Sequence, residues 1–183
     1  MHRLVDATPD WLRQDSDLFC IVYASTAVRP VIWSELPHLV ERARKRNAAE
    51  NLTGVLLYAD GTFMQCLEGP AVALGRVYAS IKVHPQHYGL LDLVRDPIQT
   101  REFAEWPMAF HAAGARGSAS LAEQDALLAS KLATADRPKS ASCSLLSDFL
   151  AGGRNSVSRA MANCKSARST RQRAADLDFS LAD

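Results

Sequence analysis

The stretch FMQCLEGP, residues 63–70, decides the fold, because it indicates a strand that runs directly into a helix. Alternation along a strand places Phe63, Gln65 and Leu67 on one face and the residues between them on the other. Pro70 suits the first position of a helix, where its missing N–H is no loss. Gln65 is a primary amide between large apolar residues, and a buried amide without partners costs about 1–3 kcal/mol. From this stretch alone, a core glutamine bonded to backbone or water is the favoured interpretation.

The chain before this stretch predicts a strand, a helix and a second strand. Leu18 to Ser25 is apolar throughout, so this strand is expected to be covered on both faces. A helix is expected to open at Ser34-Glu35 with the serine as its cap. Its inner stripe follows the i, i+3, i+4, i+7 rule and contains Leu36, Leu39, Val40, Ala43 and Asn47. Leu52 to Tyr58 is the second strand, and Asp60-Gly61 predicts a tight hairpin into the strand with Gln65.

The chain after this stretch predicts a second helix and two more strands. Residues 70–83 are helical in pattern, and their inner stripe contains Leu74, Val77, Tyr78 and Ile81. Leu90 to Arg95 is a fourth strand, which Pro97 is expected to end. Trp106 to Phe110 reads as a short fifth strand with Trp106, Met108 and Phe110 on a common face.

The element order is therefore β-α-β-β-α-β-β, which is typical of an α+β sandwich of ferredoxin-like type. Right-handed crossovers place both helices on one sheet face. Helices over residues 121–132 and 145–150 are expected to cover the other face. The expected domain organisation is an N-terminal arm (1–16), the α+β domain (17–112), a helical extension (113–151) and a basic, disordered tail (152–183).

Composition excludes several classes of protein. The formal net charge of the 183 residues is +1, which argues against nucleic acid as an obligate partner. No apolar run approaches the roughly 20 residues of a membrane helix, and the first residues lack the apolar core of a secretion signal. The four cysteines show neither a disulfide framework nor metal-ligand spacing. A reduced, soluble, cytoplasmic protein without a membrane partner is expected.

The motifs in order resemble the BLUF family, the sensors of blue light using FAD. The resemblance covers residues 17–112. It rests on Tyr23, Asn47, Leu52-Thr53-Gly54, the stretch 63–69, Ile98, Arg101-Glu102-Phe103 and Trp106-Pro107-Met108.

The resemblance implies that a flavin lies between the two helices, above the sheet face that carries Tyr23 and Gln65. FAD is the expected cofactor, with FMN as the alternative. In the mechanism that the family implies, Tyr23 gives an electron and a proton to the excited flavin and receives them back after the Gln65 amide has rearranged. The expected photoswitch residues are Tyr23, Gln65, Trp106 and Met108, and the expected cofactor-binding residues are Tyr23, Ser25, Asn47, Gln65, Arg46 and His87.

Several of these residues also have structural interpretations that the sequence leaves open. Tyr23 alone reads as a core phenol, and Asn47 as the end of its helix. Trp106 and Met108 are equally compatible with core packing and with relay of the signal. His84 and His87 lack a third metal ligand, so no metal site is expected.

The chain departs from the family pattern after the second helix. Gln86 stands where the family commonly has an arginine that approaches the cofactor phosphates, and His84 stands where it has an aspartate. Arg46 stands where an asparagine or histidine often precedes the flavin-binding asparagine. The departures imply weaker or less selective FAD binding, unless Lys82, His87 or the basic helix end (Arg42, Lys45 and Arg46) compensates.

The expected function is that of a non-enzymatic photoreceptor that signals to a downstream protein partner; a homo-oligomer is left open. About 70 residues follow Gly114, below the usual size of an autonomous enzyme domain. The alternative is a ferredoxin-like ligand-binding or scaffold module without light sensing. A phosphate-ester hydrolase on this topology is disfavoured, because residues 25–30 contain no glycine and only one cation, Arg29.

Overall fold

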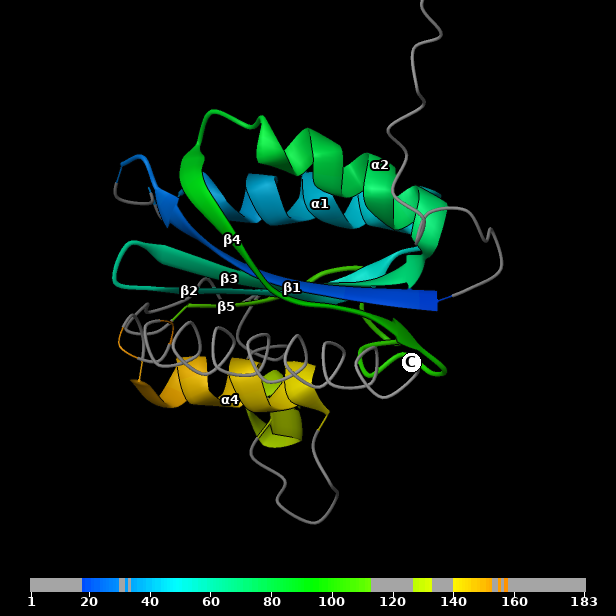
Figure 1. Cartoon of the computed structure of the whole chain (residues 1–183). Coiled ribbons are helices and arrows are strands. Elements are labelled where there is room, and N and C mark those ends of the chain that lie inside the picture. The colour runs from blue at the N-terminus through cyan, green and yellow to red at the C-terminus, as the bar shows by residue number, and fades with distance from the viewer. Residues whose placement is uncertain are drawn as a thin grey trace, which may run out of the picture.

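Five strands form one mixed sheet in the order β4-β1-β3-β2-β5, with helices on both of its faces (Figure 1). This computed structural model describes residues 18–29, 32, 34–112, 127–132, 140–152, 155 and 157. The elements in chain order are β1 (Leu18–Ala27), α1 (Leu36–Ala49), β2 (Thr53–Ala59), β3 (Thr62–Pro70), α2 (Ala71–Lys82), β4 (His87–Ile98), β5 (Ala109–Ala112) and α4 (Ala141–Gly152).

The sheet topology confirms the predicted α+β fold of ferredoxin-like type. β1 pairs antiparallel with both β3 and β4, β2 pairs antiparallel with β3, and β5 joins β2 in parallel. Figure 1 shows α1 and α2 side by side on one face of the sheet and α4 on the other, as expected. The β2–β3 hairpin turns at Asp60 and Gly61 with φ of 49° and 76°, the backbone that the Asp-Gly signal predicts.

Each sheet face has its own apolar core. The face toward α1 and α2 buries the odd-numbered residues of β1, together with the predicted inner stripe of α2 (Leu74, Val77, Tyr78 and Ile81). The opposite face buries the even-numbered residues of β1 against α4 and the helical segment 127–132, through Leu128, Leu132, Leu146 and Phe149. The expected cover of the second face is therefore confirmed for these segments; residues 121–126 lie outside the described residues.

β4 is longer than predicted and continues through Pro97. Phe19 pairs with Pro97 and Leu18 pairs with Ile98, so the strand ends at Ile98 and not before the proline. β4 lies at the edge of the sheet. A proline is tolerated at an edge because its missing N–H can face away from the neighbouring strand.

The start of α1 also differs from the prediction. The N-cap position is occupied by Glu35 and not by Ser34, and no side chain caps the helix. The Glu35 carboxylate instead accepts a hydrogen bond from Arg29 at 3.2 Å. Pro37 lies in the first turn, where helices tolerate proline.

The fifth strand begins at Ala109, three residues later than predicted. Residues 106–108 form no ladder, because their backbone carbonyls bond to other elements and Pro107 has no N–H. The predicted common face for Trp106, Met108 and Phe110 is wrong. Met108 and Phe110 join the core beneath α1 and α2, whereas Trp106 packs against the core on the opposite face.

The predicted N-terminal arm (1–16) lies outside the described residues, as does most of the predicted tail (152–183). Among the described residues, no helix has the length and apolar character needed to cross a membrane.

Glu68 connects β3 to the loop before β5. Its two carboxylate oxygens accept the backbone N–H groups of Glu102 (3.1 Å) and Phe103 (3.0 Å), and its side chain is 1% exposed. Burial raises the pKa of this carboxyl group, while the two N–H bonds oppose that shift. The loop is thus attached to the sheet by a buried acceptor.

We expect Glu68→Ala to lower the free energy of unfolding by about 2–4 kcal/mol, because it leaves two backbone donors without an acceptor. Chemical denaturation measures the change. Glu105→Ala removes an exposed carboxylate from the same loop and should stay within about 0.5 kcal/mol of the wild type. Equal effects of both substitutions would contradict this role of Glu68.

Candidate functional site

Tyr23 and Gln65 lie opposite each other on neighbouring strands. They are paired residues in the β1–β3 ladder, so their side chains emerge on the same face, toward α1 and α2. The Tyr23 hydroxyl donates a hydrogen bond to Gln65 Oε1, and both side chains are buried. The polar partner that the sequence requires for the buried amide is therefore a phenol.

The other end of the Gln65 amide faces Met108. Gln65 Nε2 lies 3.6 Å from Met108 Sδ, which accepts a weak hydrogen bond. A thioether is a weak acceptor and has no hydrogen to donate. The amide therefore has two different neighbours, one that donates to its oxygen and one that accepts from its nitrogen.

The environment of Tyr23 holds its phenol in the neutral form. Burial is the largest of the causes that raise its pKa; the nearby Tyr78 phenol raises it further, and the Arg46 guanidinium opposes both. The Tyr23 and Tyr78 rings pack with their centroids 5.3 Å apart at an angle of 51°. At neutral pH the phenol thus keeps the hydrogen that it shares with Gln65.

Tyr23 and Gln65 form part of the wall of a cavity of about 290 Å³ that extends toward α1 and α2. The cavity is lined by most of the predicted cofactor-binding residues, namely Tyr23, Ser25, Arg46, Gln65 and His87. Its apolar walls come from Leu39, Ala43, Leu56, Phe63 and Ile81. Gln86 and His84, the two departures from the family pattern, also line this cavity.

A second cavity of about 330 Å³ shares part of this wall. Both cavities are lined by Leu39, Arg42, Phe63 and Gln86, and the second also contacts Arg29 and His38. Arg42 therefore lines both cavities; that it compensates for the arginine missing at Gln86 stays a prediction.

Asn47 is buried at the end of α1 and lies outside the lining of both cavities. Its Nδ2 donates to the Pro107 carbonyl at 2.8 Å, and its Oδ1 accepts from Arg46 at 3.3 Å. The backbone carbonyl of Asn47 accepts from Leu52 at 2.7 Å, so the residue also ends its helix. Its amide holds Arg46 on one side and the chain before β5 on the other.

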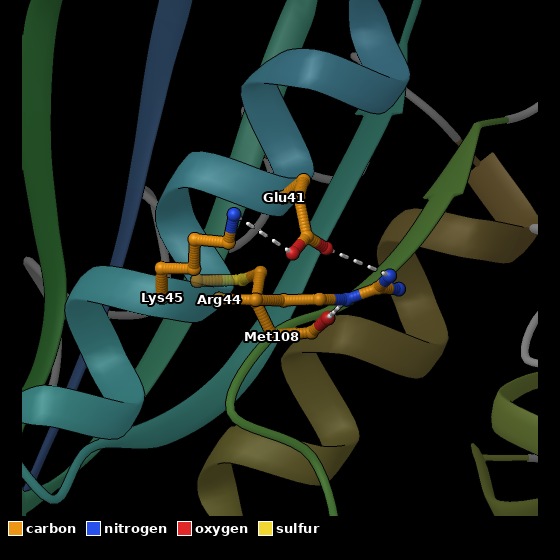
Figure 2. Close-up of polar contacts among 4 residues, drawn as sticks. All are labelled: Glu41, Arg44, Lys45 and Met108. Carbon is orange, nitrogen blue, oxygen red and sulfur yellow. Dashed lines mark hydrogen bonds and ion pairs between the residues drawn. The ribbon is translucent and has the colours of Figure 1, made fainter.

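Three consecutive carbonyls before β5 are each held by a different residue. Trp106 O accepts from the Gly54 N–H at 2.9 Å, Pro107 O accepts from Asn47, and Met108 O accepts from Arg44 Nε at 2.9 Å. Figure 2 shows the Arg44 side chain reaching from α1 to the Met108 carbonyl, with Glu41 beside its guanidinium at 4.0 Å. The sequence reasoning missed Arg44, although its place three residues before Asn47 puts both on adjoining positions of one helix face.

Trp106 lies away from the cavity. Its ring centroid is 6.4 Å from that of Phe103, and Lys131 Nζ lies 5.3 Å from its ring. Trp106 therefore contacts the helical segment 127–132 on the opposite sheet face. Met108, two residues further along, is the member of this pair that touches Gln65.

The residues around the cavity suit a flat aromatic ring with a polar edge. The walls are apolar, while the Gln65 amide, the Arg46 guanidinium and the imidazole of His87 present hydrogen-bonding groups. His87 Nδ1 is buried and has no hydrogen-bond partner among the described residues. A buried polar atom without a partner is costly, so the site is incomplete without a polar ligand.

Comparison with known proteins identifies the family. The profile of BLUF, the sensors of blue-light using FAD, matches residues 18–109. The chain belongs to the BLUF family. FAD is thus the cofactor by which its family is defined, and FMN occurs in a solved BLUF structure that resembles this chain, that of BlrP1.

The BLUF domain of this chain is similar to parts of larger light-regulated proteins. Over 95 residues it is 39% identical to the photoactivated adenylate cyclase subunit beta of Euglena longa, which covers 51% of this chain and 11% of that protein. It is 32% identical over 71 residues to the blue light- and temperature-regulated antirepressor BluF of Escherichia coli (strain K12), covering 39% and 18% of the two chains. This chain thus spans only a small part of either relative.

Two solved structures resemble the fold. The dark-state structure of the BLUF protein BlrB has a TM-score of 0.52 and 27% identity, over 54% of this chain and 75% of that one. Klebsiella pneumoniae BlrP1 with FMN and cyclic diGMP has a TM-score of 0.60 and 29% identity, over 74% and 35% of the two chains. The α+β ferredoxin-like architecture is shared with both.

A cluster of cysteines lies on the sheet face away from the cavity. The thiols of Cys20 and Cys66 are 3.5 Å apart, and with a Glu68 oxygen they fall within 4.8 Å of one another. The hydrogen bond with Cys20 and burial raise the pKa of the Cys66 thiol, which keeps it in the protonated form that binds metals poorly. We assign the cluster to the core beneath α4.

We expect the stability of the domain to fall as the pH is lowered from about 7.5 to about 5.5, in part because of His87. Burial, and then the nearby His84, lowers the pKa of His87 below 6.5. The unfolded chain therefore binds a proton in a pH range where folded His87 does not, so acid favours unfolding.

Chemical denaturation of the wild type and of His87→Gln at both pH values tests this prediction. The loss of stability on acidification should be smaller in His87→Gln. His38→Gln, at an exposed position of α1, is the matched control for the removal of an imidazole away from His84. An identical pH dependence in the wild type and His87→Gln would contradict the prediction.

Proposed function

We propose that this BLUF domain is a blue-light photoreceptor in which Tyr23 and Gln65 form a hydrogen-bond switch. The observation that supports this proposal is the bond from the Tyr23 hydroxyl to Gln65 Oε1 at the cavity wall. A bound flavin supplies absorption of blue light and an excited state that accepts an electron. Tyr23, Ser25, Arg46, Gln65 and His87 are the residues that would hold it.

Tyr23 is the electron and proton donor in this proposal. Because burial keeps the phenol neutral, it has both particles to give. Its hydroxyl hydrogen points at Gln65 Oε1, so the proton can leave only along a bond that involves the amide. Loss and return of this proton therefore act on Gln65 directly.

Gln65 is the switch because its two ends have nearly the same outline and opposite hydrogen-bonding character. Its oxygen accepts and its nitrogen donates, so rotation or tautomerisation exchanges the two without a change of volume. An ionised glutamate at this position would only accept. The exchange therefore requires an amide.

Met108 distinguishes the two arrangements of the amide. In the structure it accepts from Gln65 Nε2; in the rotated arrangement its sulfur would face the amide oxygen, to which it has no hydrogen to donate. The difference is of the order of one hydrogen bond, about 1 kcal/mol. So small a signal must bias an element that already has two accessible states.

Residues 106–108 are that element in our proposal. Met108 faces Gln65 on one side of the sheet, while Trp106 packs against Phe103 and the segment 127–132 on the other. A shift of this short segment would therefore change contacts on both faces of the sheet. Hydrogen bonds limit which shifts are possible, because the carbonyls of residues 106–108 accept from Gly54, Asn47 and Arg44.

The receptor acts on a downstream protein partner without turnover of a substrate of its own. In support, the described helices outside residues 18–109, α4 and the segment 127–132, pack on the sheet face that Trp106 contacts. These helices carry the signal to the partner. One named relative is an adenylate cyclase subunit, in which the matched BLUF region is 11% of the chain.

We expect Gln65→Leu to bind flavin and to lose the light-induced shift of the flavin absorption spectrum, because leucine has no amide to exchange. Tyr23→Phe should lose the shift as well, since it removes the donated hydrogen. The measurement compares spectra of the flavin-loaded chain in the dark and under blue light.

Gln99→Leu makes the same chemical change at an exposed position and should keep the normal shift. A reversible shift of normal size in Gln65→Leu would remove Gln65 from the mechanism. If the wild-type chain does not bind flavin, or if its spectra in the dark and under blue light are identical, the proposal of light sensing itself is wrong.

We expect Arg44→Met to uncouple residues 106–112 from the switch while leaving the spectral shift in place. The substitution frees the Met108 carbonyl but leaves Tyr23 and Gln65 untouched. Hydrogen exchange of the peptide 106–112 should rise in the dark, and its difference between light and dark should shrink.

Lys45→Met is the matched control, because Lys45 ion-pairs with Glu41 at 3.8 Å on the same helix, whereas the Met108 carbonyl accepts its hydrogen bond from Arg44 (Figure 2). It should leave the exchange of 106–112 as in the wild type. A wild-type light–dark difference in Arg44→Met would show that the signal leaves by another route.

A further inference from the structure

A second tyrosine lies next to Tyr23 and has its own proton acceptor. The ring of Tyr78, from α2, packs 5.3 Å from the ring of Tyr23. Its hydroxyl donates a hydrogen bond to Asp92 Oδ1, and its side chain is 3% exposed. Asp92 is the β4 residue paired with Tyr23 in the β1–β4 ladder, so all three side chains meet on the cofactor face of the sheet.

The carboxylate is fixed between two partners. Asp92 Oδ1 accepts from Tyr78, and Asp92 Oδ2 accepts from Arg95 Nη2 three residues along β4. One oxygen therefore stays directed at the phenol. A carboxylate at hydrogen-bond distance from a phenol is placed to act as a general base.

We propose that Tyr78 is a second photo-oxidisable tyrosine of this receptor, with Asp92 as its proton acceptor, in competition with Tyr23. This inference rests on the proposed function, because its oxidant is the excited flavin. A bound flavin would supply the oxidant in its excited state: Tyr78 would give it one electron, the O–H bond of Tyr78 would break, and the proton would form an O–H bond with Asp92 Oδ1. The products are a neutral tyrosyl radical and a neutral carboxylic acid; return of the electron and the proton restores both residues.

Loss of the proton together with the electron is what makes this site suitable. Burial, then the hydrogen bond to Asp92, raises the pKa of Tyr78, so the phenol does not ionise by itself at neutral pH. Without an acceptor, oxidation would leave a cation close to Lys82 Nζ, 4.7 Å from the ring centroid, and to the Arg95 guanidinium, 5.6 Å from it. Transfer of the proton to Asp92 leaves a neutral ring instead.

Oxidation of Tyr78 does not move Gln65. The described hydrogen bond of the Tyr78 hydroxyl runs to Asp92, whereas that of Tyr23 runs to the amide. An excitation that oxidises Tyr78 therefore decays, by return of the electron and the proton, without a change at Gln65. The competition between the two phenols sets the fraction of absorbed photons that reach the switch.

The decisive experiment is transient absorption of the flavin-loaded Tyr23→Phe chain, in which the first donor is absent. We expect a tyrosyl radical. The yield of this radical should fall by about tenfold or more in Tyr23→Phe/Tyr78→Phe, because the second donor is then absent as well. It should fall by a similar factor in Tyr23→Phe/Asp92→Asn, since loss of a positioned base typically costs about 10²-fold in rate. Asparagine keeps the shape of Asp92 but takes up no proton at neutral pH.

Tyr23→Phe/Tyr58→Phe is the matched control. Tyr58 is another buried tyrosine of the same core, with its ring 4.9 Å from that of Phe63, and its loss should leave the radical yield unchanged. Three outcomes overturn the proposal: no tyrosyl radical in Tyr23→Phe, a radical that survives Tyr78→Phe, or a tryptophanyl radical in its place.

A second measurement uses the intact Tyr23. Tyr78→Phe and Asp92→Asn should each raise the quantum yield of the light-induced spectral shift, because both remove the competing route. A merely structural role of the Tyr78–Asp92 bond predicts an unchanged or lower yield. The wild-type shift tests the proposed function, so its presence with no effect of either substitution would overturn this inference alone.

Discussion

The site depends on the register of β1 against β3. Tyr23 and Gln65 face each other because these strands pair antiparallel with this residue opposite that one. A slip of one residue would turn every side chain of the slipped strand to the other face and place Gln65 under α4 instead of beneath the cavity. The register is secured because both faces of these strands are buried, so a slip would disturb two cores and not one. The hydrogen bond is therefore a consequence of packing across the whole sheet.

The two cores also explain how a local change can reach the far side of the molecule. The sheet separates the cavity from α4, and its strands are packed too closely on both faces to move independently. Residues 106–108 are the exception, since they precede β5 and form no ladder. Their position between the layers, with Met108 on one side and Trp106 on the other, makes them the part of the described chain best suited to respond to Gln65. Arg44 and Asn47 attach this segment to α1, so the helix that lines the cavity also restrains residues 106–108.

The features that the sequence predicted correctly follow from local rules. Alternation along β3 placed Gln65 and Leu67 on one face, the family resemblance implied that Tyr23 shares it, and Asp60-Gly61 predicted the hairpin turn. The errors occur where a residue's role depends on distant partners. Pro97 was expected to end its strand because the edge position of β4 is a property of the complete sheet. Trp106 was given the face of Met108 because alternation assumes a ladder, and the carbonyls of residues 106–108 bond to Gly54, Asn47 and Arg44 instead. The Tyr78–Asp92 bond joins a helix to an edge strand, and nothing in the local pattern of either element indicates it.

Two buried phenols pack against each other, and one of them, Tyr23, lies at the cavity wall, so the proposed mechanism must distinguish a signalling donor from its neighbour. Burial holds the pKa of both above the ordinary value, so both keep their protons, and their rings are in contact. They differ in the group that receives the hydrogen. The carboxylate at Tyr78 can take up a proton and return it, and it is held in one orientation by Arg95, so its two states have the same shape. The amide at Tyr23 has a donor end as well as an acceptor end, and the neighbour of its donor end is Met108. In the proposed mechanism, a proton that passes the amide leaves a different hydrogen-bond pattern behind, and this asymmetry of the acceptor is what would allow only Tyr23 of the two phenols to carry a signal.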